Sequence, residues 1–172
     1  MTDVFKSEKN LENQLMLLKK EFGLCAIKAE FEAEGSSFRD IIRLRRITLA
    51  QGVPLYLKIG GAEAIRDIKD ALDLGVDGLV APMVESAFGL VKFLNACRFI
   101  YGNRKIFKSI NVETRQAAES IDDILKVASL NIENITIGRT DLSQSYFDEQ
   151  VQPDSKFIQD LIISLIQRVS IA

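Results

Sequence analysis

The residue types of this chain that could do acid–base or metal chemistry are limited, because the sequence contains no histidine. Without histidine there can be no Ser-His-Asp triad, no Cys-His dyad, no histidine-ligated zinc site and no histidine pH switch. Acid–base or metal chemistry must therefore come from carboxylates, Lys, Arg, Tyr or water. The candidates are Glu30, Glu32, Lys58, Glu85, Glu113 and Asp141.

A repeating pattern of elements is expected to bring these candidates to one side of the molecule. An apolar strand, a polar tip and an amphipathic helix follow one another five times between residues 24 and 169. Such alternation predicts an α/β fold with parallel strands, whose carboxyl ends meet at one edge where ligand sites form. The expected strands are 24–29, 53–59, 78–84, 106–112 and 132–137, and the helices follow at 38–51, 64–74, 88–98, 117–129 and 157–169.

An amphipathic helix precedes the repeating part. Leu11, Leu15, Leu18 and Phe22 recur at helical spacing, and Gly23 ends the helix. We therefore divide the chain into an N-terminal helix, residues 1–23, and one α/β domain, residues 24–172. A full eight-fold barrel needs about 250 residues, so 172 residues are too few for one, and an open flavodoxin-like sheet is an alternative.

Charge and motifs argue against nucleic acid and nucleotides as partners. The net charge is −2, and the basic cluster Arg43, Arg45 and Arg46 is expected on a solvated helix face. The first strand lacks a G-x-G-x-x-G motif and a P-loop.

The cellular setting is predicted to be cytoplasmic. The first ten residues are charged and lack the apolar region of a signal peptide, and no apolar run approaches the ~20 residues of a membrane span. Cys25 and Cys97 each lie in an apolar run, which predicts buried free thiols in a reducing compartment.

Several carboxylates around one edge call for a cation that neutralises them. Oxygen ligands without His or Cys suit Mg²⁺ or Mn²⁺ rather than zinc. In the simpler alternative, each acid caps the helix that follows its strand. Two alternatives also stay open for Lys58, which is either a snorkelling edge residue or a cation aimed into the site. Gly60 and Gly61 either let backbone amides approach an anion or form a tight turn.

Three stretches, in this order, resemble a known family. They are Ala81-Pro82-Met83-Val84-Glu85-Ser86, Ile110-Asn111-Val112-Glu113-Thr114 and Ile137-Gly138-Arg139-Thr140-Asp141-Leu142-Ser143. They are similar to the PMVES, VET and IGPADLS motifs of the HpcH/HpaI aldolase and citrate lyase family, a branch of the pyruvate/phosphoenolpyruvate-type barrels. Lys58 falls where that family carries an Arg, and Glu30-Phe31-Glu32 is similar to its acidic strand tip.

The resemblance implies a TIM-barrel-like (β/α) fold that is incomplete, because the family continues through at least one more strand beyond the helix at 157–169. A chain that appears truncated at its C-terminus has three explanations: a fragment, a wall supplied by a partner chain, or an open sheet. The apolar last helix favours burial against another copy, so a homo-oligomer is expected.

The resemblance also implies a function, that of a metal-dependent carbon–carbon lyase. The substrate would be a 2-keto acid of the pyruvate or oxaloacetate type, or an acyl-CoA, cleaved through a metal-stabilised enolate. Glu113 and Asp141 would hold Mg²⁺ or Mn²⁺, and Lys58 would add positive charge beside the enolate. Gly60, Gly61, Glu85 and Ser86 would bind the substrate. The general base would be Glu30, Glu32 or a metal-bound water. The alternative is a non-catalytic member that binds a metabolite or serves as a structural subunit.

Overall fold

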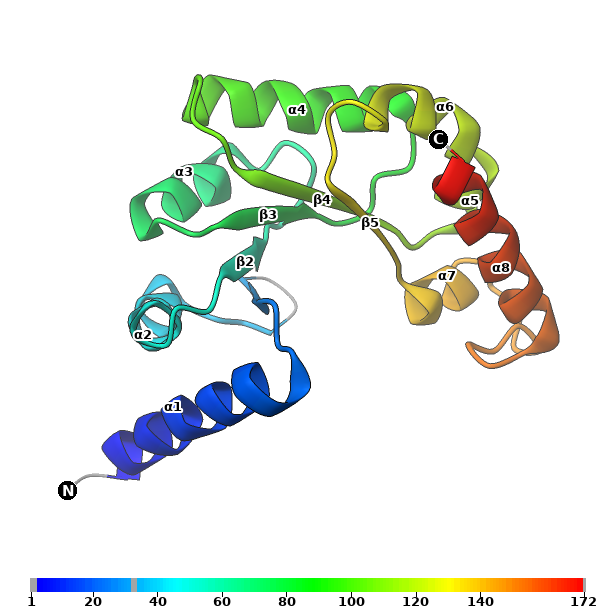
Figure 1. The fold of residues 1–172 in the computed structure, drawn as a ribbon. Coiled ribbons are helices and arrows are strands. Elements are labelled where there is room, and N and C mark those ends of the chain that lie inside the picture. The colour runs from blue at the N-terminus through cyan, green and yellow to red at the C-terminus, as the bar shows by residue number, and fades with distance from the viewer. Residues whose placement is uncertain (1–2, 32–33, 172) are drawn as a thin grey trace.

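A computed structural model of the chain describes residues 3–31 and 34–171 (Figure 1). The strands are β1 (Ile27–Glu30), β2 (Leu55–Lys58), β3 (Gly78–Ala81), β4 (Phe107–Val112) and β5 (Asn134–Ile137). The helices are α1 (Asp3–Phe22), α2 (Phe38–Ala50), α3 (Ile65–Leu74), α4 (Ala87–Tyr101), α5 (Arg115–Glu119), α6 (Ile121–Ala128), α7 (Arg139–Gln144) and α8 (Lys156–Ile171).

The strands form one parallel sheet in the order β1-β2-β3-β4-β5, which is the order of the sequence. This confirms the predicted α/β class. The flavodoxin-like alternative is wrong, because that fold places its second strand outside the first. Sequential parallel strands are the arrangement of a (β/α) barrel. Within the described residues the sheet is not closed, since β1 and β5 are its two edges.

The helices lie in an arc around the strands, from α2 through α3 and α4 to α6 and α8 (Figure 1). Along this arc each of these helices contacts the next, and α1 contacts α2. The main core fills the space between helices and sheet, where Leu57, Leu79 and Ile110 are fully buried with Ile68 and Phe93. A second cluster joins Val112 to α5–α8. Packing of this kind positions the carboxyl ends of all five strands at one edge.

Alternation along the strands sends one set of side chains to the helices and the other to the inner side of the sheet. On the inner side, the rings of Tyr56 and Phe107 stack with centroids 4.5 Å apart. Gly78 lies between them in the register, and a Cβ there would be 2.6 Å from Tyr56 Cδ1. The glycine therefore allows this aromatic pair to cover the amino-terminal part of the inner side.

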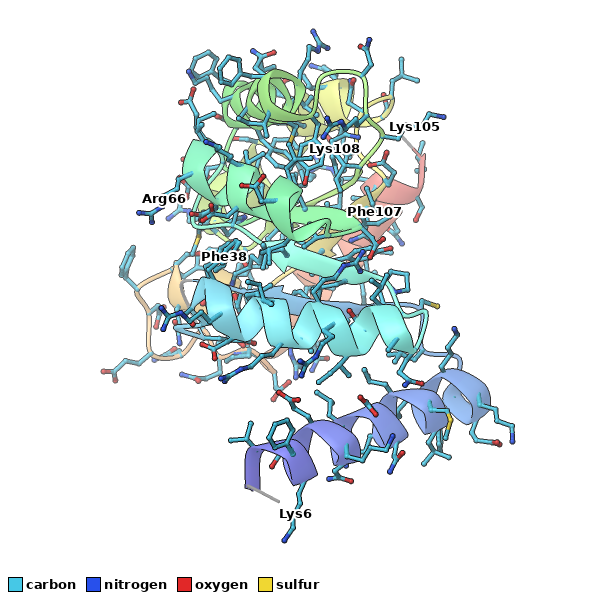
Figure 2. All side chains as sticks on the ribbon, turned by 90° about the vertical axis from the view of Figure 1, so that its left-hand side faces the viewer. Lys6, Phe38, Arg66, Lys105, Phe107 and Lys108 are labelled. Atoms are coloured by element: carbon cyan, nitrogen blue, oxygen red, sulfur yellow. The ribbon has the colours of Figure 1, made fainter. Side chains whose placement is uncertain are left out.

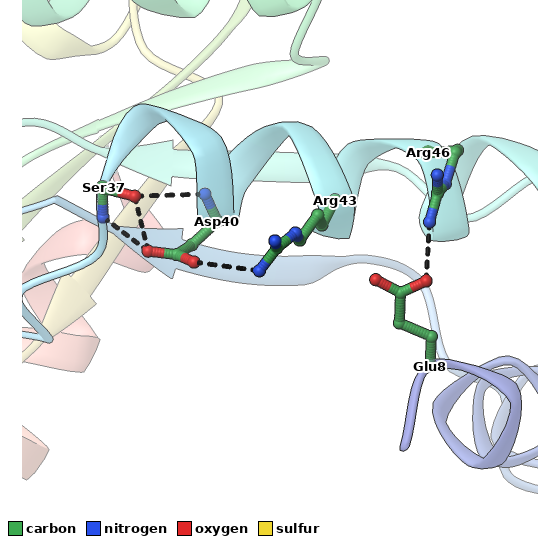
Figure 3. A network of polar contacts seen from close by, with 5 residues as sticks. All are labelled: Glu8, Ser37, Asp40, Arg43 and Arg46. Carbon is green, nitrogen blue, oxygen red and sulfur yellow. Dashed lines mark hydrogen bonds and ion pairs between the residues drawn. The ribbon is translucent and has the colours of Figure 1, made fainter. Parts of the chain in front are cut away.

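The N-terminal helix is tied to the domain through α2. Ser37 caps α2 in a capping box with Asp40 (Figure 3). Arg46 reaches Glu8 of α1 at 2.6 Å. The side chains of Arg43 and Arg46 are 59% and 66% exposed, as expected of a solvated face. The expectation is wrong for Arg45, whose side chain is only 16% exposed and pairs with Asp77 at 2.7 Å. The described residues thus give this basic cluster a structural role.

Some expected elements differ from those observed. The helix expected at 117–129 is two helices, α5 and α6, because the backbone bends at Ser120 (φ −92°, ψ 7°). Helix α7 was not predicted. The first strand begins at Ile27 rather than at residue 24, which leaves Cys25 exposed, so its predicted burial is wrong whereas Cys97 is buried.

Two further expectations concern the surface. No helix in the part of the chain that the structure describes is long and apolar enough to cross a membrane. Helix α8 exposes Phe157, Ile163, Ile166 and Ile171. Self-association through such a face stays a prediction.

Candidate functional site

Glu113 follows β4 directly and lies buried at the carboxyl edge of the sheet, with 4% of its surface exposed. Its Oε1 accepts a hydrogen bond from the backbone amide of Met83 at 2.9 Å. Its Oε2 accepts another from Asn111 Nδ2 at 3.0 Å. None of the ion pairs among the described residues includes Glu113. The carboxylate is thus oriented by neutral donors while its charge stays unmatched.

The end of β5 passes very close to Glu113. A Cβ on Gly138 would lie 2.8 Å from both Cβ and Oε2 of Glu113, so this position has room for glycine only. The Gly138 amide also donates to the carbonyl oxygen of Val112 at 3.1 Å. Immediately after Gly138 the chain turns into α7, whose first turn carries Asp141. Gly138 therefore brings the start of α7 to the strand end that carries Glu113.

Asp141 is exposed, and no ion pair in the described ranges includes it. The structure thus places the two predicted metal ligands at the ends of adjacent strands, both without a cationic partner. No cluster of three or more His, Cys, Asp or Glu side chains among the described residues could hold a metal. The donor set fits Mg²⁺ or Mn²⁺, because such ions are often bound by one or two carboxylates and keep several waters.

Lys58 and Glu30 are partners in the β1–β2 register, and Lys58 Nζ forms an ion pair with Glu30 Oε2. Their side chains are 18% and 9% exposed. Lys28 Nζ lies 3.7 Å from Glu30 Oε1. Burial alone raises the pKa of Glu30, but the hydrogen bond from Lys58 and the charge of Lys28 outweigh it, so this pKa lies below its usual range. Glu32 lies outside the described residues.

The predicted substrate-binding residues already have internal contacts. The Gly60 amide donates to Asp67 Oδ2 at 2.7 Å, and Asp67 is buried in the first turn of α3. Ser86 caps α4 and accepts from the Gly89 amide at 3.1 Å, while Glu85 is exposed. A side chain at Gly61 would meet open space. Asp67 therefore lies beside the candidate site. The sequence analysis considered only residues at the strand ends and missed Asp67, because it lies in the first turn of the helix that follows.

A band of neutral polar side chains on the inner side of β4 and β5 was also missed. Asn134 Nδ2 donates to Ser109 Oγ at 2.9 Å and to Thr136 Oγ1 at 3.1 Å. Asn111, which holds Glu113, belongs to the same side. Polar and apolar residues alternate along both strands, and this period-two signal could have found the band.

A sequence model of the HpcH/HpaI aldolase/citrate lyase family matches residues 58–159. The chain belongs to this family. The matched range includes Lys58, Glu113 and Asp141, whereas Glu30 lies outside it.

Curated relatives agree with this assignment. The 2-keto-3-deoxy-L-rhamnonate aldolases of Salmonella newport and Salmonella typhi are each 27% identical over 157 residues, covering 76% of this chain. The chain spans 56% of the length of these curated relatives.

Solved structures resemble the chain in fold. The crystal structure of the citrate synthase SbnG matches with a TM-score of 0.74 at 18% identity, covering 92% of this chain and 69% of SbnG. An HpcH/HpaI aldolase from Desulfitobacterium hafniense DCB-2 matches with a TM-score of 0.73 at 18% identity, with coverages of 92% and 69%. At this identity the likeness shows the fold, an incomplete TIM-barrel-like sheet.

Proposed function

We propose that this chain carries the site of a metal-dependent carbon–carbon lyase acting on a 2-keto acid. The observation that carries the proposal is Glu113, a buried carboxylate oriented on both oxygens by neutral donors and unpaired with any cation of the described residues. A buried carboxylate without a positive neighbour is costly unless it is neutralised. A divalent cation shared with Asp141 would neutralise it.

The names of the relatives suggest the substrate class. They act on 2-keto-3-deoxy-L-rhamnonate. In an acid of this type, cleavage of the bond between C3 and C4 releases pyruvate by way of its enolate. Bound Mg²⁺ or Mn²⁺ would supply Lewis-acid stabilisation of that enolate.

The residues of this chain would then divide the remaining tasks. Lys58 adds positive charge beside the developing enolate, and Glu30 holds the lysine in place. The lowered pKa of Glu30 makes it a weak proton acceptor, so we assign proton acceptance to water at the site. The backbone amide of Gly61 and the exposed Glu85–Ser86 turn border the space for the substrate's polar groups.

A second candidate function is a non-catalytic family member that binds a metabolite or serves as a structural subunit. Two observations favour it. Lys58 is already paired with Glu30, and the Gly60 amide is already occupied by Asp67, so neither is free for a substrate anion.

Calorimetric titration with Mn²⁺, with and without pyruvate, tests the proposal. We expect saturable binding by the wild-type chain, loss of binding in Asp141→Ala, and unchanged binding in Asp73→Ala. Asp73 is a matched control because it is an exposed aspartate on α3. Pyruvate release from 2-keto-3-deoxy-L-rhamnonate is then measured on the same proteins.

The outcomes separate the two functions. Metal binding and turnover that both disappear in Asp141→Ala support the lyase. Metal binding without turnover favours the metabolite-binding alternative. A folded wild-type chain that binds no Mn²⁺ overturns the metal-dependent site.

A further inference from the structure

A cavity of about 600 Å³ lies at the opposite end of the sheet from Glu113. It is bordered by the last turns of α4, the connection to β4 and the residues before β5. Figure 2 shows Lys105 and Phe107 on the right-hand side of the molecule, with Phe38 and Arg66 on the left. Phe107 and Lys108 begin β4, whereas Glu113 follows its carboxyl end. The cavity is therefore separate from the candidate lyase site.

The lining of this cavity is strongly basic. Four of its residues are Arg98, Arg104, Lys105 and Lys108, and its one acidic residue is Glu133. Lys108 Nζ lies 3.2 Å from Glu133 Oε1, and the Lys108 amide donates to Glu133 Oε2 at 2.7 Å. No ion pair within the described residues includes Arg98, Arg104 or Lys105. Three cations around one cavity thus have no internal counter-charge.

One residue that lines the same cavity carries a buried hydroxyl without a partner. Tyr101 lines it and is only 7% exposed, and its hydroxyl oxygen has no hydrogen-bond partner among the described residues. Buried polar groups in folded proteins are almost always hydrogen-bonded, so an orphaned hydroxyl indicates a missing partner. Burial, followed by the neighbouring Cys97, raises the pKa of Tyr101 to about 12, although Arg104 lowers it. The hydroxyl therefore keeps its proton and can donate.

We propose that this cavity binds a small polyanion, a molecule with two or more phosphate or carboxylate groups. Arg98, Arg104 and Lys105 would neutralise its charge, and the Tyr101 hydroxyl would donate to one of its oxygens. Arginine suits such a ligand, because its planar guanidinium matches the spacing of phosphate and carboxylate oxygens. The site does not depend on the proposed lyase function, since none of its lining residues belongs to the carboxyl edge.

Calorimetry with inorganic pyrophosphate and, separately, tricarballylate tests this site on protein freed of divalent metal by a chelating resin, in a buffer that contains neither divalent metal nor soluble chelator. Any divalent-metal site is then empty, so failure here and failure of the lyase proposal are distinguishable. The first variant combines Arg104→Ala with Lys105→Ala, both exposed residues. The second is Tyr101→Phe, which removes only the hydroxyl. The control combines Lys6→Ala with Lys69→Ala, which removes two exposed positive charges outside the cavity.

We expect saturable binding of at least one probe that weakens as salt is raised. The Arg104/Lys105 double variant and Tyr101→Phe should each bind about tenfold more weakly, because a hydrogen bond to a charged group is lost in each. The control should stay within about twofold of wild type. Binding of pyrophosphate alone assigns a phosphate ligand, and binding of tricarballylate alone assigns a carboxylate. Absence of binding by both probes, or equal weakening in the control, overturns the proposal. Binding by Tyr101→Phe as tight as that of wild type shows that the hydroxyl does not contact the ligand.

Discussion

Glu113 holds the backbone amide of Met83 at 2.9 Å and so joins the end of β4 to the end of β3. Met83 has a φ of 50°, a left-handed conformation that is uncommon for any residue other than glycine. Strained backbone of this kind persists only where the surrounding structure fixes it, and it gathers at functional sites. The same carboxylate thus fixes a loop conformation and is the proposed metal ligand.

Replacement of that carboxylate by an amide separates its two roles. In Glu113→Gln the remaining carbonyl oxygen can still accept from Met83, but the new amide nitrogen faces the Asn111 amide. We expect the free energy of unfolding to change by about 1–2 kcal/mol and Mn²⁺ binding to be lost. Chemical denaturation and calorimetry measure these two quantities. Exposed Glu119→Gln is the control, and undiminished Mn²⁺ binding in Glu113→Gln would exclude this residue as a ligand.

Gly138→Ala tests the close approach of β5 to Glu113. The added methyl group would lie 2.8 Å from Glu113 Oε2, so the carboxylate or the strand end must move. We expect a loss of about 1–3 kcal/mol in the free energy of unfolding, together with weaker Mn²⁺ binding. Gly61→Ala is the matched control, because a Cβ there meets nothing within 4 Å. Equal stability of the two variants in urea denaturation would contradict this prediction. It would show that the end of β5 moves away from Glu113 at little cost in free energy.

The strand ends could be predicted from the sequence because short apolar runs, each followed by a polar tip and an amphipathic helix, mark them. The pairing of Lys58 with Glu30 could not be predicted, because it depends on the β1–β2 register. The residues of neither strand determine that register by themselves. A lysine at the end of a strand can lack an obvious acidic partner in the sequence although the fold supplies one. The contact of the Gly60 amide with Asp67 could not be predicted either, because it depends on how the start of α3 packs against the end of β2.

The short helices after β4 and β5 were hard to predict for another reason. Helix α7 spans only six residues, too few for the apolar period of a helix to show. The break at Ser120 separates α5 from α6 although apolar residues continue on both sides. Both features depend on packing against α8 and the end of the sheet, which is tertiary information.

The Lys58–Glu30 pair predicts a specific dependence of stability on pH. The pKa of Glu30 is lower in the folded chain than its ordinary value of 4.5, so the carboxylate form stabilises the fold above that value. This stabilisation is lost as the pH falls through the lowered pKa. We therefore expect wild type to exceed Glu30→Gln in free energy of unfolding at pH 7, with a gap that shrinks below about pH 4.5. Urea denaturation at a series of pH values measures the gap.

The control for that series is Glu85→Gln, an exposed glutamate with no ion pair in the described part of the chain. Its difference from wild type should stay small at every pH. A gap for Glu30→Gln that is constant from pH 7 down to pH 3 would contradict the role of the ion pair.

Lys58→Arg asks whether the lysine acts through its charge alone. An arginine at this position can still pair with Glu30, because its guanidinium offers two parallel donors to a carboxylate. We expect Lys58→Arg to keep part of the lyase activity and nearly all of the stability. Lys58→Met should lose both, since it leaves the buried carboxylate of Glu30 without its main partner. Pyruvate release and urea denaturation of both variants, beside wild type, decide between the two. Complete inactivation of a stable Lys58→Arg protein would show that the reaction needs the ammonium group itself, because the larger guanidinium supplies the same charge.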